Sequence, residues 1–109
     1  MSVTWSQEAG ENLVDIEEFI ARDSVERAVR FVDALIDHAE TILADSPRSG
    51  RVVPEISNPD IRELIYRGYR IVYRIKGEVL EILTVFEGHR LLRLSKEDKG
   101  SALENGKLK

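Results

Sequence analysis

The sequence predicts an α+β domain of chain order β-α-α-β-β-β, in which a helical hairpin packs on one face of a twisted antiparallel sheet. Two apolar stripes with helical spacing occupy residues 9–43, and runs of β-forming residues occupy residues 61–86. The length of 109 residues suits one compact domain. We assign residues 1–94 to this single domain and expect the polar residues 95–109 to form a flexible C-terminal tail.

The first half of the chain predicts a short strand and two antiparallel helices. Ser2–Trp5 alternates polar and apolar residues, as a strand does. Ser6 and Ser24 are the expected N-caps of the helices, because an acidic residue that suits a helix N-terminus follows each of them. Only about two residues separate the stripes, so the helices must fold back as a hairpin. The second helix should end at Asp45-Ser46-Pro47, since proline disfavours helical geometry in the residue before it.

The second half of the chain predicts an antiparallel meander. Three runs are rich in isoleucine, valine, tyrosine and leucine, and turn residues at Gly68 and Gly77 separate them. These runs are Ile61–Arg67, Tyr69–Lys76 and Val79–Phe86. The segment Val52-Val53-Pro54 is a candidate edge strand, because proline cannot donate a hydrogen bond to a neighbouring strand.

Alternation along these strands predicts which side chains share a face of the sheet. Arg70 and Arg74 should point from the same face of the middle strand. The last strand is apolar on both faces, which is typical of a central strand. Its predicted faces are Leu80, Ile82, Thr84 and Phe86 on one side and Val79, Glu81, Leu83 and Val85 on the other.

The composition excludes several classes of protein. With 42% hydrophobic and 33% charged residues, the chain is typical of a soluble globular protein. No apolar run approaches the roughly 20 residues that a membrane span needs, and the N-terminus lacks the pattern of a secretory signal. The absence of cysteine excludes disulfides and thiolate sites. We therefore expect a cytoplasmic protein that does not associate with a membrane.

The motifs that mark nucleotide binding, zinc proteolysis and serine hydrolysis are absent from the sequence. Of the two histidines, His38 lies beside Asp37 on the second helix and is expected to be a surface residue. No spacing of carboxylates suggests a metal site around His89. The sequence therefore predicts neither a cofactor nor a bound metal.

Charge is distributed unevenly along the chain. Residues 1–45 hold 3 Arg against 11 acidic residues, whereas residues 46–94 hold 9 basic against 6 acidic residues. This segregation suggests two faces with different partners. The alternative is that the acidic half is simply the solvated side of the helices.

The basic residues of the second half are nearly all arginines, whose planar forks suit phosphates and carboxylates. They could hold RNA phosphates during backbone cleavage, with His89 as a general acid or base, or they could dock an acidic protein segment. A structural alternative pairs them with Glu63, Glu78 and Glu81 across the strands. We favour the structural alternative for Arg48, Arg67 and Arg93. The candidate binding residues are Arg51, Arg62, Arg70, Arg74 and Arg90.

The ordered set of strand motifs resembles the RelE/ParE family of bacterial type II toxins. The resemblance is strongest in Gly68–Ile75, with the pattern YRIVYRI, and in Ile82–Arg90, which ends in EGHR. Ile61–Leu64, the loop Pro47–Arg51 and the two amphipathic helices fit the same family, so the resemblance covers roughly residues 2–93. It implies the β-α-α-β-β-β fold, growth arrest, plasmid stabilisation, and neutralisation by a cognate antitoxin in a toxin–antitoxin hetero-oligomer.

The family has two branches with different targets. RelE-like members cut messenger RNA on the ribosome, and for that branch the resemblance implies Arg51, Arg70 and His89 as candidate catalytic residues. ParE-like members inhibit DNA gyrase and are not nucleases. This chain has no lysine in residues 46–75, no tyrosine after Tyr73 and an acidic net charge of -4, whereas ribosome binders are usually basic.

We therefore favour the ParE-like branch, which is not enzymatic. The RelE-like endoribonuclease and an inactive interaction module remain the alternatives. We expect the antitoxin to add a helix or strand over the apolar surface of the helical hairpin or at the sheet edge, because residues 25–43 are unusually rich in apolar side chains.

Overall fold

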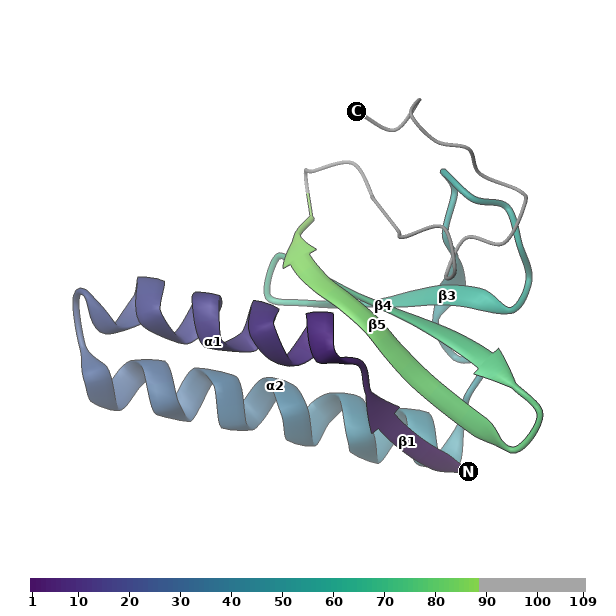
Figure 1. Cartoon of the computed structure of the whole chain (residues 1–109), viewed down its shortest axis with the longest axis horizontal. Helices are drawn as coiled ribbons and strands as arrows, with labels where there is room; N and C mark the ends of the chain where they lie inside the picture. Colours follow the sequence, from purple (N-terminus) through teal and green to yellow (C-terminus); the bar gives the residue numbers. More distant parts are fainter. Residues whose placement is uncertain (89–109) are drawn as a thin grey trace.

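A computed structural model describes residues 1–88 and confirms the α+β class, with a helical hairpin against a five-stranded sheet (Figure 1). The predicted order of elements is confirmed, and the candidate edge strand at Val52-Val53-Pro54 is present as two residues, Arg51–Val52. The elements are β1 (Ser2–Trp5), α1 (Gln7–Ala21), α2 (Val25–Asp45), β2 (Arg51–Val52), β3 (Ile61–Tyr66), β4 (Tyr69–Lys76) and β5 (Val79–Glu87).

The sheet has the strand order β1-β5-β4-β3-β2 and is mixed. Strands β2 to β5 are antiparallel to their neighbours as expected, but β1 runs parallel to β5, with Ser2 opposite Val79. The chain leaves the edge strand β1, passes through both helices and the strands β2, β3 and β4, and returns as β5 to run beside β1 in the same direction. The edge strand β2 ends at Val52, before Pro54.

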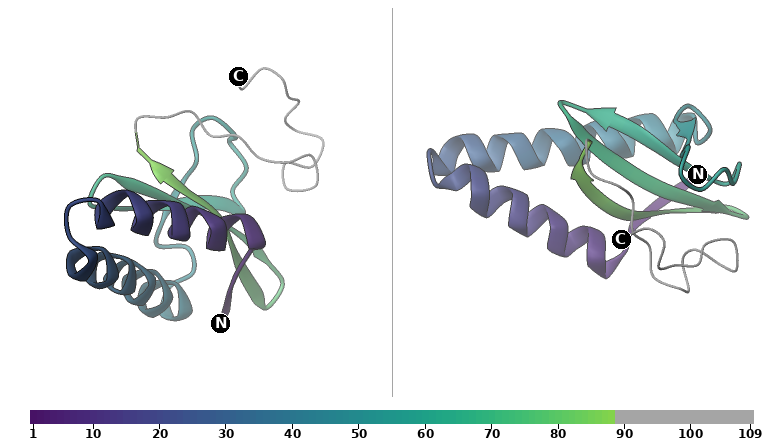
Figure 2. Two further views of the ribbon diagram at one scale, coloured as in Figure 1. Left: turned by 60° about the vertical axis from the view of Figure 1, so that its left-hand side comes forward. Right: turned by 90° about the horizontal axis from the view of Figure 1, so that it is seen from above.

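Both helices begin where the sequence predicts. The Ser6 hydroxyl accepts a hydrogen bond from the Ala9 N–H at 3.0 Å, and the Ser24 hydroxyl accepts one from the Arg27 N–H at 3.1 Å. The hairpin covers one face of the sheet and projects beyond it (Figures 1 and 2). No helix within residues 1–88 is long and apolar enough to cross a lipid bilayer.

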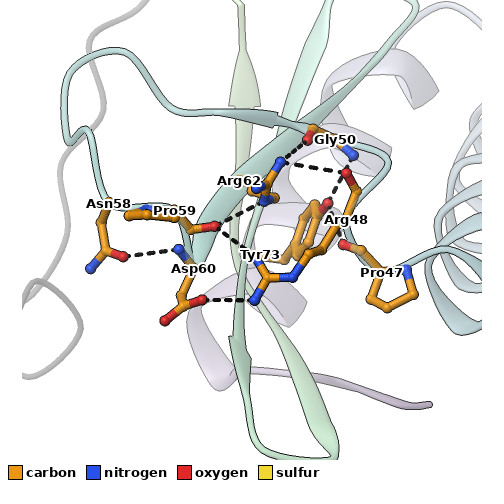
Figure 3. A network of polar contacts seen from close by, with 8 residues as sticks. All are labelled: Pro47, Arg48, Gly50, Asn58, Pro59, Asp60, Arg62 and Tyr73. Carbon is orange, nitrogen blue, oxygen red and sulfur yellow. Dashed lines mark hydrogen bonds and ion pairs between the residues drawn. The ribbon is translucent and has the colours of Figure 1, made fainter.

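The main core lies between the hairpin and the sheet, and Tyr73 is its largest fully buried side chain. Its hydroxyl accepts the Gly50 N–H at 3.0 Å and donates to the Pro47 carbonyl at 2.8 Å (Figure 3). Burial raises the pKa of this phenol, which favours the neutral donor form. A side chain at Gly50 would collide with the Tyr73 hydroxyl and the backbone of Glu63. Tyr73 therefore fastens the α2–β2 connection to the middle of the sheet.

A β-bulge breaks the alternation predicted for β5. Val72 lies opposite Thr84 but Tyr73 lies opposite Ile82, so Leu83 is the extra residue. After this point the faces are exchanged: Val85 packs in the main core and Phe86 packs on the opposite face. The prediction that Phe86 shares a face with Leu80 and Ile82 was therefore wrong, because strict alternation does not allow for an inserted residue.

We predict that Tyr73→Phe lowers the free energy of unfolding by about 1–3 kcal/mol, because it leaves the buried Gly50 N–H without an acceptor. Tyr66→Phe is the matched control, since the Tyr66 ring contacts Phe31 and His38 while its hydroxyl makes no hydrogen bond among the described residues. Urea denaturation of both variants measures the difference. Equal losses in the two variants would contradict this role for the Tyr73 hydroxyl.

Candidate functional site

The candidate site lies on the sheet face that the helices leave open. A second apolar cluster forms there, in which Val53 and Ile56 from the β2–β3 connection cover Ile61, Val72 and Leu83. Arg70 and Arg74 of β4 share this face with Val72, as the alternation predicts. The β2–β3 connection therefore folds back over the sheet beside the predicted arginines.

Arg70 is almost completely buried, with 5% of its surface exposed. Its two terminal nitrogens donate to both carboxylate oxygens of Glu55, at 2.7 and 2.8 Å, and its Nε donates to Glu63 at 2.6 Å. The guanidinium also lies 5.2 Å from the centre of the Phe86 ring. The hydrogen bonds that Arg70 donates to Glu55 raise the Arg70 pKa, against the opposite effect of burial. Arg70 therefore carries a permanent charge that two carboxylates neutralise inside the protein.

Glu63 of β3 joins Arg70 to a second candidate arginine. Its carboxylate, with no exposed side-chain surface, also accepts the Arg51 Nε at 2.5 Å. The result is an alternating series, Arg51–Glu63–Arg70–Glu55, which we call the charge row. Arg51 differs from Arg70 because 61% of its side chain is exposed. The charge row links β2, β3, β4 and the β2–β3 connection, and its four formal charges cancel.

Arg62 is held by backbone carbonyls at the start of β3. Its Nε donates to the Pro59 carbonyl at 2.8 Å and its Nη1 to the Gly50 carbonyl at 3.0 Å (Figure 3). Arg48 lies beside it and forms an ion pair with Asp60 at 3.0 Å. These contacts tie the α2–β2 connection, at Arg48 and Gly50, to the end of the β2–β3 connection, at Pro59 and Asp60.

Arg74 lies away from the charge row, opposite Glu81 in the register of β4 and β5. The two side chains form an ion pair at 3.3 Å, and both are partly exposed. They line an open depression of about 440 Å³ together with Thr4, Lys76 and Val79. This depression mixes charges of both signs and has no group of convergent acids.

The structure thus brings Arg51 and Arg70 together around Glu63, and places Arg62 and Arg74 elsewhere. His89 and Arg90 lie outside the described residues. Glu63 and Glu81 are partners of arginines, as the structural alternative predicts, whereas Glu78 forms no ion pair within residues 1–88.

Glu55 is the residue that sequence reasoning missed. It occupies the third position of a turn that Val53 begins and in which Pro54 is second, closed by a hydrogen bond from the Ile56 N–H to the Val53 carbonyl. The proline turn after an edge strand was a local signal that the chain reverses there. It did not indicate that the reversal places a carboxylate on Arg70.

Within the described part of the chain, no group of three or more histidine, aspartate or glutamate side chains is placed to hold a metal ion. The arrangement offers exposed guanidinium surface at Arg51 and an internally neutralised arginine at Arg70. Such a face can contact a macromolecule through the exposed Arg51 at its edge, whereas Arg70 is already bound within the protein.

Comparison with known proteins gives a consistent picture. The family model of the ParE toxin of the type II toxin–antitoxin system parDE matches residues 3–92. The fold is similar to a chain of the chromosomal ParDE TA system from P. aeruginosa, with a TM-score of 0.67 and 22% identity over 80% of this chain and 95% of that one. It is also similar to a chain of the toxin–antitoxin complex RelBE2 from Mycobacterium tuberculosis, with a TM-score of 0.58 and 21% identity over 79% and 95% of the two chains. No curated protein matches the sequence.

We predict that Arg70→Met lowers the free energy of unfolding by about 3–5 kcal/mol, because it leaves the buried Glu63 and Glu55 without their common partner. Arg74→Met is the matched control on the same strand face, where loss of a partly exposed pair costs about 0–1 kcal/mol. Denaturant unfolding of both variants measures the two losses. An Arg70 variant as stable as the Arg74 variant would show that the charge row does not support the fold.

Proposed function

Since the chain belongs to the ParE toxin family of type II toxin–antitoxin systems, we propose that it arrests bacterial growth by inhibiting DNA gyrase. In this proposal the chain acts in the cytoplasm as a binding inhibitor and catalyses no reaction. A cognate antitoxin holds it silent in a hetero-oligomer until the antitoxin is lost.

The burial of Arg70 and its two carboxylate partners are the main support for gyrase as the target rather than RNA. A nuclease stabilises the charge that develops on a phosphate with cations that are free to meet it. Here the ends of the Arg70 guanidinium already bind Glu55, its Nε binds Glu63, and 5% of the residue is exposed. Binding RNA there would require breaking two buried ion pairs. This favours the branch that does not cleave RNA.

The negative charge of the helical half also favours a protein target over ribosomal RNA. Residues 1–45 carry 11 acidic residues against 3 arginines, and all of these lie in the hairpin that projects from the sheet (Figure 1). Such a surface is repelled by the phosphates of ribosomal RNA. A protein target does not impose this cost.

The endoribonuclease remains a second candidate because of Arg51. Its side chain is 61% exposed, and only its Nε is bound to Glu63, so its terminal nitrogens can meet an external phosphate. If the protein were a nuclease, Arg51 would be the described residue best placed to touch RNA.

We predict that the purified chain inhibits DNA supercoiling by gyrase and increases the amount of cleaved DNA held in the gyrase complex. Agarose gels of plasmid DNA measure both effects, and prior mixing with the antitoxin should remove them. Undiminished supercoiling at a large excess of the chain would contradict the gyrase proposal.

Messenger RNA from cells that express the chain separates the alternatives. We expect primer extension to show no codon-positioned cuts. Cuts that disappear in Arg51→Gln would instead establish the nuclease. Growth without arrest, in the absence of antitoxin, would assign the chain to an inactive interaction module.

A further inference from the structure

Glu55 binds Arg70 in the way that an external oxyanion would. The two oxygens of its carboxylate accept hydrogen bonds from the two terminal nitrogens of the Arg70 guanidinium, at 2.7 and 2.8 Å. This paired contact is the one by which arginine recognises carboxylates and phosphates. The Arg70 Nε donates separately to Glu63, at 2.6 Å. Glu55 therefore occupies the part of Arg70 that would hold a ligand.

The two carboxylate partners of Arg70 differ in how they are held. Glu63 lies within β3, in register with Val72 of β4, and its side chain has no exposed surface. Glu55 lies on the β2–β3 connection, and 17% of its side chain is exposed. Displacing Glu55 moves a loop, whereas displacing Glu63 disturbs the sheet. Glu55 is thus the partner that a ligand can replace.

The β2–β3 connection, residues 53–60, is fixed at both ends. At its start the Val53 N–H donates to the Ile61 carbonyl at 3.2 Å. At its end the Pro59 carbonyl accepts hydrogen bonds from Arg48 at 3.2 Å and from Arg62 at 2.8 Å (Figure 3). The segment that carries Glu55 lies between these points. Motion of this segment leaves both ends attached to the sheet.

Ser57 adds a cost to the closed arrangement of this connection. Its φ of +59° is left-handed, which is unfavourable for a residue with a β-carbon. Three kinds of contact offset that cost. The Ser57 hydroxyl donates to the Pro54 carbonyl at 3.3 Å, Ile56 packs in the apolar cluster, and Glu55 binds Arg70. The contact with Arg70 therefore helps to hold the connection closed.

Removal of Glu55 would leave the charge row with one net positive charge, because Arg51, Glu63 and Arg70 would remain. Both arginines bind the same Glu63 carboxylate through Nε, so their guanidinium groups lie close together. A phosphate has more acceptor oxygens and more negative charge than a carboxylate. It can therefore accept from the terminal nitrogens of Arg70 and of the exposed Arg51 together.

We propose that Arg70 and Arg51 form a phosphate-binding site, that the β2–β3 connection is its lid, and that Glu55 is an internal competitor that keeps the site closed. A tethered carboxylate acts at an effective concentration of about millimolar or more, so free phosphate displaces it poorly. This inference goes beyond gyrase inhibition and does not depend on it. It makes Glu55 the residue that decides whether Arg70 meets a phosphate.

Titration of the full chain with inorganic phosphate tests the inference, followed by nitrogen-15 NMR of the arginine Nε–H groups. We expect Glu55→Ala to lower the apparent Kd for phosphate at Arg70 by about tenfold or more, because the competitor is gone. Asp60→Asn is the matched control, since it removes one negative charge from the same connection but releases the half-exposed Arg48. It should leave the response of Arg70 as it is in the unaltered chain.

Glu55→Gln keeps the length of the side chain and removes its charge. It should produce the same gain in affinity to a smaller extent, and it carries the test if Glu55→Ala does not fold. A parallel titration with a short single-stranded RNA distinguishes the sources of phosphate. A response of Arg70 to both probes assigns the site to phosphodiesters, and a response to inorganic phosphate alone assigns it to the free ion.

Three results would overturn the inference. The first is the absence of any Arg70 response in both Glu55 variants while the Arg70 Nε–H stays protected by Glu63. The second is equal affinity at Arg70 in the unaltered chain and in Glu55→Ala, because Glu55 would then not compete. The third is an equal gain in Asp60→Asn and Glu55→Ala, because net charge would then decide the affinity. The supercoiling assay measures gyrase inhibition separately from all three.

Discussion

The carboxylate of Glu63 is the group on which the open face of the sheet depends. It has no exposed side-chain surface, and a buried carboxylate without partners would be very costly. Two arginines, from β2 and β4, supply the charge that it needs, and Glu55 then balances the second of them. The β2–β3 connection carries Glu55 to this row of charges, and the small apolar cluster and the buried Arg70 lie beneath that connection.

Local patterns were sufficient to predict the helices, their serine caps and the three long strands, because these depend on the spacing of residues close in the chain. The bulge at Leu83 was not predictable in this way, since an inserted residue is visible only against the register of the neighbouring strand. The parallel pairing of β1 with β5 and the contact of Glu55 with Arg70 likewise join distant segments. Alternation did place Arg70 on the correct face, but it could not show that the side chain is buried there.

The two halves of the molecule therefore differ in how their charge is used. In the basic half, most of the arginines bind groups within the protein, namely Glu63, Asp60, Glu81 and backbone carbonyls. The acidic half leaves its carboxylates at the surface, beside apolar residues of the hairpin. An arginine-rich strand is thus a poor guide to nucleic-acid binding unless the burial and partners of each arginine are known.

The burial of Arg70 between Glu63 and Glu55 is tested most directly by the hydrogen exchange of the arginine side chains, measured by nitrogen-15 NMR on the Nε–H groups. We expect slow exchange at Arg70, whose Nε–H is buried against Glu63, and fast exchange at Arg67, which is exposed in the β3–β4 turn. Fast exchange at both residues would contradict it, because Arg70 would then be free in solution to meet a phosphate.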